Sequence, residues 1–187
     1  SPHSANRWAG TRLDTQQPSK LAAMELATET ETEAPLILGG VLVDDEVRGG
    51  IEIPKLASLL AGNSFDTEII GFDQIPDDEE PPANVVHFAF QTMIAAGTAM
   101  IGVAAWWAWR RQRHGDSDAV FDSPWFLRAA VAAGPIAVVA LEAGWTTTEV
   151  GRQPWIVYRV MRVEDAVTSN SGIWFTLAAM VVVYASM

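Results

Sequence analysis

Two glutamates in or beside a long apolar stretch are the side chains whose position most directly suggests chemistry. Glu142 and Glu149 lie seven residues apart, so both point from one face if the stretch is helical. A carboxylate inside an apolar span is costly and marks a functional site by default. We therefore predict that Glu142 takes up or releases protons. Glu149 lies nearer the end of the stretch, so a solvated structural role stays open for it.

Three apolar stretches must position these side chains, at about residues 85–109, 125–148 and 172–187. A helix of about 25 residues is about 37 Å long, enough to cross a hydrocarbon core of about 30 Å. The third stretch reaches only about 24 Å as a helix. We predict an all-α membrane protein with about three transmembrane helices within residues 84–187. Three core helices of a soluble protein are the alternative, but they would need more polar covering than this chain supplies.

The charge of the chain is concentrated before these stretches. Sixteen of the 23 acidic residues lie between Asp14 and Ala83, together with three Lys or Arg. We predict that residues 1–83 form a loop-rich extramembrane segment with short helices near Ser19–Thr28 and Ile53–Ala61. The chain has no basic stripe to meet phosphates, which argues against nucleic-acid binding. It has no cysteine, which excludes disulfides and thiolate metal sites.

The arginines suggest an orientation in the membrane. Arg110, Arg111 and Arg113 follow the first apolar stretch, whereas the residues just before that stretch, 77–80, are all acidic. Positively charged loops favour the cytoplasmic side, so we predict that the acidic N-terminal segment faces outward. Further arginines at positions 152, 159 and 162 follow the second stretch and need a separate explanation.

Four stretches, in this order, resemble subunit I of the cytochrome bd quinol oxidases. They are QQPSKLAAME at 16–25, GIEIPKL at 50–56, FQTM at 90–93 and EVGRQPW at 149–155. The resemblance covers nearly the whole chain and corresponds to the C-terminal part of that subunit, with its quinol-binding loop and last transmembrane helices. The chain begins without Met and ends inside an apolar run, so we expect it to be a piece of a longer protein.

The resemblance implies a function in a terminal oxidase of the cytoplasmic membrane of a prokaryote. Such an oxidase takes electrons from quinol and passes them through b-type haems, with haem d as a further possibility, to reduce oxygen to water. The implied partners are the rest of subunit I, subunit II, quinol, oxygen and the lipid bilayer. The alternative is a catalytically inactive fragment of a divergent paralogue that binds haem or has a structural role.

Lys20 and Glu25 match the family positions implicated in quinol binding. Oxidation of a quinol releases two protons, so a carboxylate near the hydroxyl can accept one, and an ammonium can tune that carboxylate. Five residues apart on a helix, the two side chains point in different directions, but they can still contact opposite sides of a head group. Two ordinary surface charges are the alternative.

Met93 matches the family's thioether ligand to the low-spin haem b. A soft sulfur ligand favours ferrous iron and raises the potential of the site. The family residue two positions earlier is usually Arg, but here it is Gln91. His87 lies about 240° around the helix from Met93, so it is not the second axial ligand. In the family that ligand is a histidine on an earlier helix. A Met that faces lipid or core is the alternative.

The stretch from Gly151 to Trp155 resembles the family's motif beside the haems. Arg152 would pair with a haem propionate, and Trp155 would pack against a macrocycle, although an interfacial anchor is an alternative role for Trp155. A glutamate four residues after this tryptophan ligates a high-spin haem in the family, but this chain has Arg159 there. Glu142 and Glu149 are the candidates to replace it, through haem contact.

Overall fold

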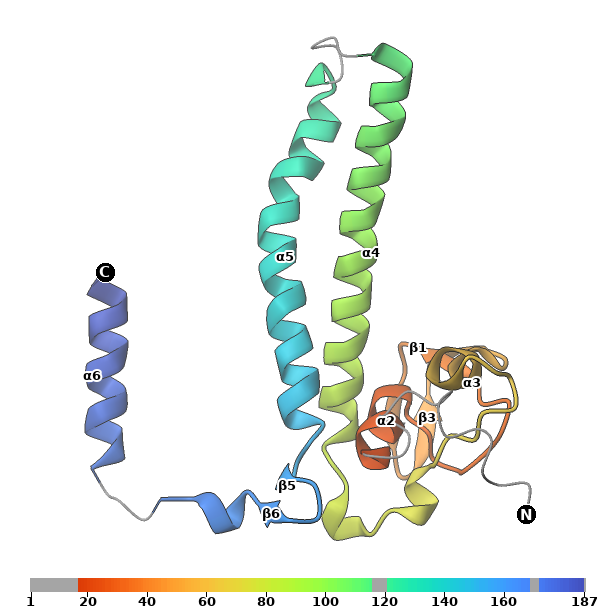
Figure 1. Cartoon of the computed structure of the whole chain (residues 1–187), viewed down its shortest axis with the longest axis vertical. Coiled ribbons are helices and arrows are strands. Elements are labelled where there is room, and N and C mark those ends of the chain that lie inside the picture. The colour runs from red at the N-terminus through yellow and green to blue at the C-terminus, as the bar shows by residue number, and fades with distance from the viewer. Residues whose placement is uncertain (1–16, 116–120, 169–171, 187) are drawn as a thin grey trace.

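The computed structural model describes residues 17–115, 121–168 and 172–186. Two long helices, α4 (Ala83–His114) and α5 (Pro124–Val150), run side by side over most of their length (Figure 1). A small unit formed by residues 17–80 packs beside the first turns of α4, and a third helix, α6 (Ile173–Ser186), stands apart. Residues 1–16 of the predicted extramembrane segment and Met187 of the third apolar stretch lie outside the described residues.

The long helices begin and end where their sequences favour it. Ser123 caps α5, since its Oγ accepts a hydrogen bond from the backbone N–H of Phe126 at 3.3 Å, and Pro124 follows at the first helical position. Arg111, Arg113 and His114 lie in the last turn of α4, where positive charge complements the helix dipole. Gly115 ends that helix with a φ of +63°.

Both long helices have the length and composition of membrane spans. An 18-residue stretch within each has a mean hydropathy of 1.5 in α4 and 1.7 in α5, and few residues of these stretches are buried. Exposed apolar surface of this extent needs lipid or further helices to cover it. With 14 residues, α6 is shorter than either. The chain is thus mostly helical, with two described helices long and apolar enough to cross a membrane.

Arginines and aromatic rings gather at the end of the helix pair far from the small unit. Arg113 lies over the ring of Trp109, with its Cζ 4.5 Å from the ring centroid, and Arg128 lies over Trp125 at 5.0 Å. Between the helices, Trp106 and Phe126 meet edge to face at 5.7 Å. Such a belt suits a membrane interface, where the ring is half apolar and the guanidinium stays hydrated.

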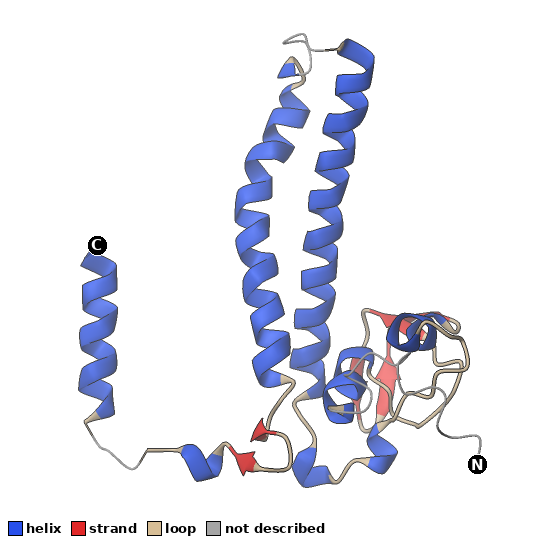
Figure 2. Ribbon diagram, viewed as in Figure 1, coloured by secondary structure: helices blue, strands red, loops and turns tan. Residues whose placement is uncertain are grey.

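The small unit contains more regular structure than a loop-rich segment suggests (Figure 2). The predicted short helices are present as α2 (Pro18–Glu25) and α3 (Leu56–Gly62). Four strands lie between them: β1 (Leu36–Leu38), β2 (Val41–Val43), β3 (Glu46–Arg48) and β4 (Ile51–Ile53). Two 3-10 turns, η2 (Phe72–Gln74) and η3 (Asp77–Glu79), lead into α4.

The four strands form one hairpin with a glycine joint. β2 pairs with β3 around Asp44 and Asp45, which both have positive φ, as a two-residue hairpin turn requires. β1 pairs with β4 beneath this tip, and Gly39–Gly40 and Gly49–Gly50 connect the two tiers. A Cβ on Gly40 would lie 3.0 Å from the Cα of Gly50, so the two chains cross too closely for a side chain there.

The prediction of an all-α membrane protein with a loop-rich segment did not include these short strands. A third two-stranded sheet, β5 (Trp155–Val157) with β6 (Met161–Arg162), follows α5, and η5 (Glu164–Ala166) comes after it. The strands have only two or three residues each, so turn and glycine chemistry determines them more than any alternating pattern does.

The small unit has a core of its own. Buried apolar side chains from α2, β1, α3 and the segment after α3 form it: Leu21, Ala34, Leu36, Ala57, Ala61 and Ile69. A fully buried Leu or Ile stabilises the fold by about 1.5–3 kcal/mol relative to an exposed one. Helix α2 also contributes Ala23 and Met24 to a second cluster with Val86 of α4. Thus α2 connects the small unit to the first span.

Candidate functional site

Helix α2 lies where the small unit meets the ends of the two long helices (Figure 1). Pro18 stands in its first turn, where a missing N–H costs nothing. Every residue from Ser19 to Glu25 is buried, with Lys20 8% and Glu25 7% exposed. The reading of Lys20 and Glu25 as ordinary surface charges therefore does not hold, because buried charges are rare unless they are paired or functional.

Gly151, at the end of α5, brings Lys20 to the helix pair. A Cβ on Gly151 would lie 3.0 Å from Cγ of Lys20 and 3.3 Å from Cγ1 of Val86. A side chain at this position would therefore push α2 and α4 away from the end of α5. Two of the sequence stretches that suggested the family, at 16–25 and 149–155, meet at this glycine.

The surroundings of Lys20 lower the pKa of its ammonium group. Burial has the largest effect, the positive charge of Arg152 adds to it, and the negative charge of Glu149 opposes both. Lys20, Glu149 and Arg152 thus form one electrostatic group. The ammonium of Lys20 releases a proton more easily than a lysine in water does.

The carboxyl group of Glu25 has a pKa near neutral pH. Burial raises its pKa from 4.5 to about 7. Its Oε2 atom is buried and has no hydrogen-bond partner among the described residues. A carboxyl group with such a pKa exists in both protonation states at physiological pH, which is the property required of a proton acceptor. The unpartnered oxygen is free to accept a hydrogen bond from a ligand.

Glu25 also lies in the wall of a cavity of about 570 Å³ in the small unit. Acidic residues of the hairpin and of the segment after α2 share this wall: Glu29, Glu31, Asp45, Glu46 and Glu52. Negative charge of this kind attracts protons and cations and repels anions. The cavity therefore offers a hydrated acidic surface next to Glu25.

Arg152 and Trp155 have donors that the described protein does not use. Arg152 Nη2 lies 3.5 Å from Glu149 Oε1, but its Nε is buried without a partner. The ring nitrogen Nε1 of Trp155 is buried without a partner as well. Buried hydrogen-bond donors normally have an acceptor. We therefore expect another molecule to supply an acceptor to these two nitrogen atoms. A haem propionate has the charge and the lone pairs to fit them.

Met93 fits into space left by a glycine of the neighbouring helix. Its Sδ lies 3.0 Å from the position of a Cβ on Gly144, so α4 and α5 approach closely at this sulfur. A half-buried thioether in an apolar span fits one axial position of a haem. Of the described histidines, His114 is at the other end of α4, and His87 is already bound to backbone carbonyls.

Glu142 does not join the group at Lys20. Its side chain is exposed on α5, two residues from Gly144. The structure thus brings together Lys20, Glu149 and Arg152 and leaves Glu142 on the outer face of the helix pair. Among the described residues, no group of three or more His, Asp or Glu could hold a metal ion.

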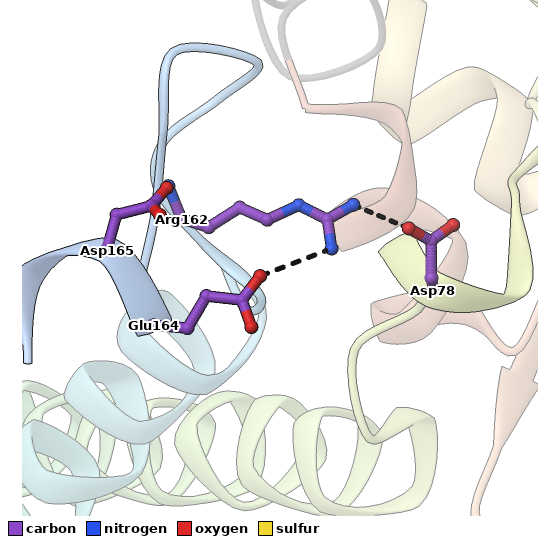
Figure 3. Close-up of polar contacts among 4 residues, drawn as sticks. All are labelled: Asp78, Arg162, Glu164 and Asp165. Atoms are coloured by element: carbon purple, nitrogen blue, oxygen red, sulfur yellow. Dashed lines mark hydrogen bonds and ion pairs between the residues drawn. The ribbon is translucent and has the colours of Figure 1, made fainter.

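The arginines after α5 have acidic and aromatic neighbours. Arg162 Nη2 contacts Asp78 Oδ2 at 2.6 Å, and Arg162 Nη1 lies 3.8 Å from Glu164 Oε1 (Figure 3). The hydrogen bond from Arg162 lowers the pKa of Asp78. Arg159, where the family has its glutamate, is exposed and lies over the ring of Tyr158 at 5.2 Å. Acidic neighbours therefore account for a positive charge on this side.

Three polar side chains of α4 were not singled out as a group from the sequence. Asn84, His87 and Gln91 all bond to the backbone of the small unit. Their spacing of three and four residues places them on one helical face, and this periodicity was the available signal.

Comparison with known proteins places the chain in a family. Residues 5–187 match the family model described as cytochrome bd terminal oxidase subunit I. The chain belongs to this family. A putative cytochrome bd menaquinol oxidase subunit I of Bacillus subtilis is 36% identical over 176 residues, which are 90% of this chain and 38% of that protein. A cytochrome bd ubiquinol oxidase subunit 1 of the same organism is 28% identical, with the same coverage.

A solved structure has the same fold. The bd oxidase from Geobacillus thermodenitrificans superposes with a TM-score of 0.79 at 37% identity, over 93% of this chain and 40% of that one. The chain spans about two fifths of the length of the relatives that it matches. It therefore corresponds to one part of a bd-type terminal oxidase subunit.

Proposed function

We propose that this chain is the quinol-binding part of a bd-type oxidase that reduces oxygen to water with electrons from quinol. The observation that carries the proposal is the burial of Lys20 and Glu25 on α2, against the ends of both long helices. A buried carboxyl group with a pKa of about 7 accepts a proton from a bound quinol at neutral pH.

In this proposal Glu25 and Lys20 have separate tasks. The unpartnered oxygen of Glu25 accepts the hydrogen bond of a quinol hydroxyl and then its proton. The acidic cavity beside Glu25 receives that proton and passes it to the water outside. Lys20 contacts the other side of the head group, and its partial burial next to Arg152 and Glu149 keeps it in place.

Met93, Arg152 and Trp155 would hold haem b. Met93 would ligate the iron from one side, while Arg152 Nε and Trp155 Nε1 would donate to a propionate. The haem would accept single electrons at a potential raised by the thioether. The other ligand to the iron would come from residues outside this chain, and a further haem b and haem d would belong to the complete oxidase.

The positions of the charged residues support an orientation in the membrane. The end of the helix pair with Arg110, Arg111 and Arg113 would face the cytoplasm of a prokaryote, and the acidic unit with the quinol site would face outward. Glu142 and Glu149 would contribute to proton handling or haem contact within the complete oxidase, together with subunit II.

A second function is favoured by Arg159. This arginine is exposed on Tyr158, at the position where the family supplies a haem ligand. An inactive haem-binding or structural subunit would tolerate this change.

Oxygen uptake decides between the two functions. The complete subunit I with subunit II, in membranes, should consume oxygen when menaquinol or ubiquinol is added. Bound haem without oxygen uptake would favour the inactive subunit. Absence of both bound haem and oxygen uptake would rule out the oxidase.

A further inference from the structure

One face of the first two turns of α4 carries three polar side chains that bond to the backbone of the small unit. Asn84 makes two bonds to Leu42: its Oδ1 accepts from the backbone N–H at 2.7 Å, and its Nδ2 donates to the backbone carbonyl at 2.9 Å. Gln91 Nε2 donates to the carbonyl of Ile37 at 2.8 Å. The helix thus pairs with β1 and β2 through side chains, as a neighbouring strand would through its backbone.

His87 is the central and most buried member of this face. Its exposed fraction is 0%. Its Nδ1 lies 2.7 Å from the carbonyl oxygen of Met24, and its Nε2 lies 2.8 Å from that of Gly39. Both ring nitrogens thus lie within hydrogen-bond distance of backbone carbonyls of the small unit.

The contact with Met24 connects this face to the quinol site. Met24 directly precedes Glu25 at the end of α2, so its carbonyl fixes the backbone that carries the Glu25 side chain. His87 in turn lies six residues before Met93 on the same helix, a rise of about 9 Å. His87 thus contacts the residue next to the proposed proton acceptor, and it lies on the helix that carries the proposed haem ligand.

We propose that His87, with Asn84 and Gln91, is a positioning residue for quinol oxidation. These side chains clamp the quinol-binding unit onto the first span and set the placement of Glu25 relative to Met93. The inference rests on the proposed function, because it needs a quinol at Glu25 and a haem at Met93. Such placement matters, since a shift of about 1 Å in a reacting group can cost about a hundredfold in rate.

The test compares two substitutions of His87 in the complete oxidase. His87→Phe keeps an aromatic ring and loses both ring nitrogens, whereas His87→Gln keeps an amide group that can donate a hydrogen bond. We expect catalytic efficiency (kcat/KM) for quinol to fall about tenfold or more in His87→Phe, with a smaller loss in His87→Gln. The reduced-minus-oxidised haem spectrum should stay that of the unsubstituted enzyme. His114→Phe, at the other end of α4, is the matched control and should leave quinol kinetics unchanged.

Hydrogen exchange provides a second readout. Amides of residues 18–53 should exchange faster in His87→Phe than in the unsubstituted oxidase, while those in the middle of α5 should not change. If His87→Phe does not assemble with haem, then His87→Gln and Asn84→Leu decide by the same two measurements.

Two results are distinguishable from each other. Unchanged quinol kinetics and unchanged exchange in the variants that retain haem would overturn the clamp and leave the proposed function standing. An unsubstituted oxidase without quinol-driven oxygen uptake would overturn the proposed function itself.

Discussion

Replacement of Glu25 by Gln tests the proposed chemistry most sharply among single substitutions. The change keeps the size of the side chain and removes its ability to ionise. With a pKa of about 7, about 10% of Glu25 is ionised at pH 6 and about 90% at pH 8. If the carboxylate is the proton acceptor, kcat/KM for quinol should therefore rise close to tenfold over this range in the unsubstituted oxidase.

In Glu25→Gln this rise should disappear, and kcat/KM at pH 8 should fall about 10²- to 10⁴-fold, the usual contribution of a general base. The assay is quinol-driven oxygen uptake by the complete oxidase between pH 5.5 and about 8.5. Glu68→Gln is the matched control, since Glu68 is exposed and does not line the acidic cavity. A Glu25→Gln enzyme with the rate and pH profile of the unsubstituted oxidase would refute the role of this carboxylate.

The raised pKa of Glu25 also makes the free energy of unfolding depend on pH. Because the pKa of Glu25 is higher in the folded state than its ordinary value of 4.5, folding is favoured at low pH. This contribution is fully present below pH 4.5 and is lost as the pH rises to about 7, by about 3 kcal/mol. Glu25→Gln should remove this loss, so α2 should be better protected from hydrogen exchange at pH 8 in the variant. Weaker protection would contradict the burial of an unpaired carboxylate.

Two further substitutions probe the two ends of the site. Lys20→Met keeps the buried stem and removes the ammonium, so KM for quinol should rise about tenfold with the haem spectrum unchanged; Lys55→Met, at an exposed lysine paired with Glu33 at 2.8 Å, should leave KM unaltered. Gly144→Val should force Met93 away from α5, at a cost of about 1–3 kcal/mol, and diminish the low-spin haem signal. Gly134→Val, on the same helix with nothing within 4 Å of its Cβ position, should leave that signal intact.

The sequence allowed the long helices to be predicted, because their signals are local. An apolar run of about 25 residues determines a span through its length, and capping residues determine its ends. The short helices near Ser19 and Leu56 were predicted for similar reasons. The glycine pairs of the hairpin could not be assigned a role in the same way, since the close crossing of Gly40 and Gly50 depends on contacts between separate strands.

The burial of Lys20 and Glu25 could not be derived from local pattern either. Charged side chains such as these are typical of a solvated helix surface. The contact of Lys20 with Gly151 joins residues that are far apart in the sequence. His87 was considered as a haem ligand and rejected on its helical angle. Its actual partners, the carbonyls of Met24 and Gly39, belong to residues that are 63 and 48 positions away.

The central claim is that this chain contributes the quinol site and one haem ligand to a bd-type oxidase. The most direct test is the visible reduced-minus-oxidised spectrum of the complete oxidase after addition of quinol, with and without Met93→Leu. We predict b-type haem bands in the unsubstituted enzyme and loss of the low-spin component in Met93→Leu. Absence of b-type bands from the unsubstituted enzyme, or an unchanged low-spin band in Met93→Leu, would contradict this account.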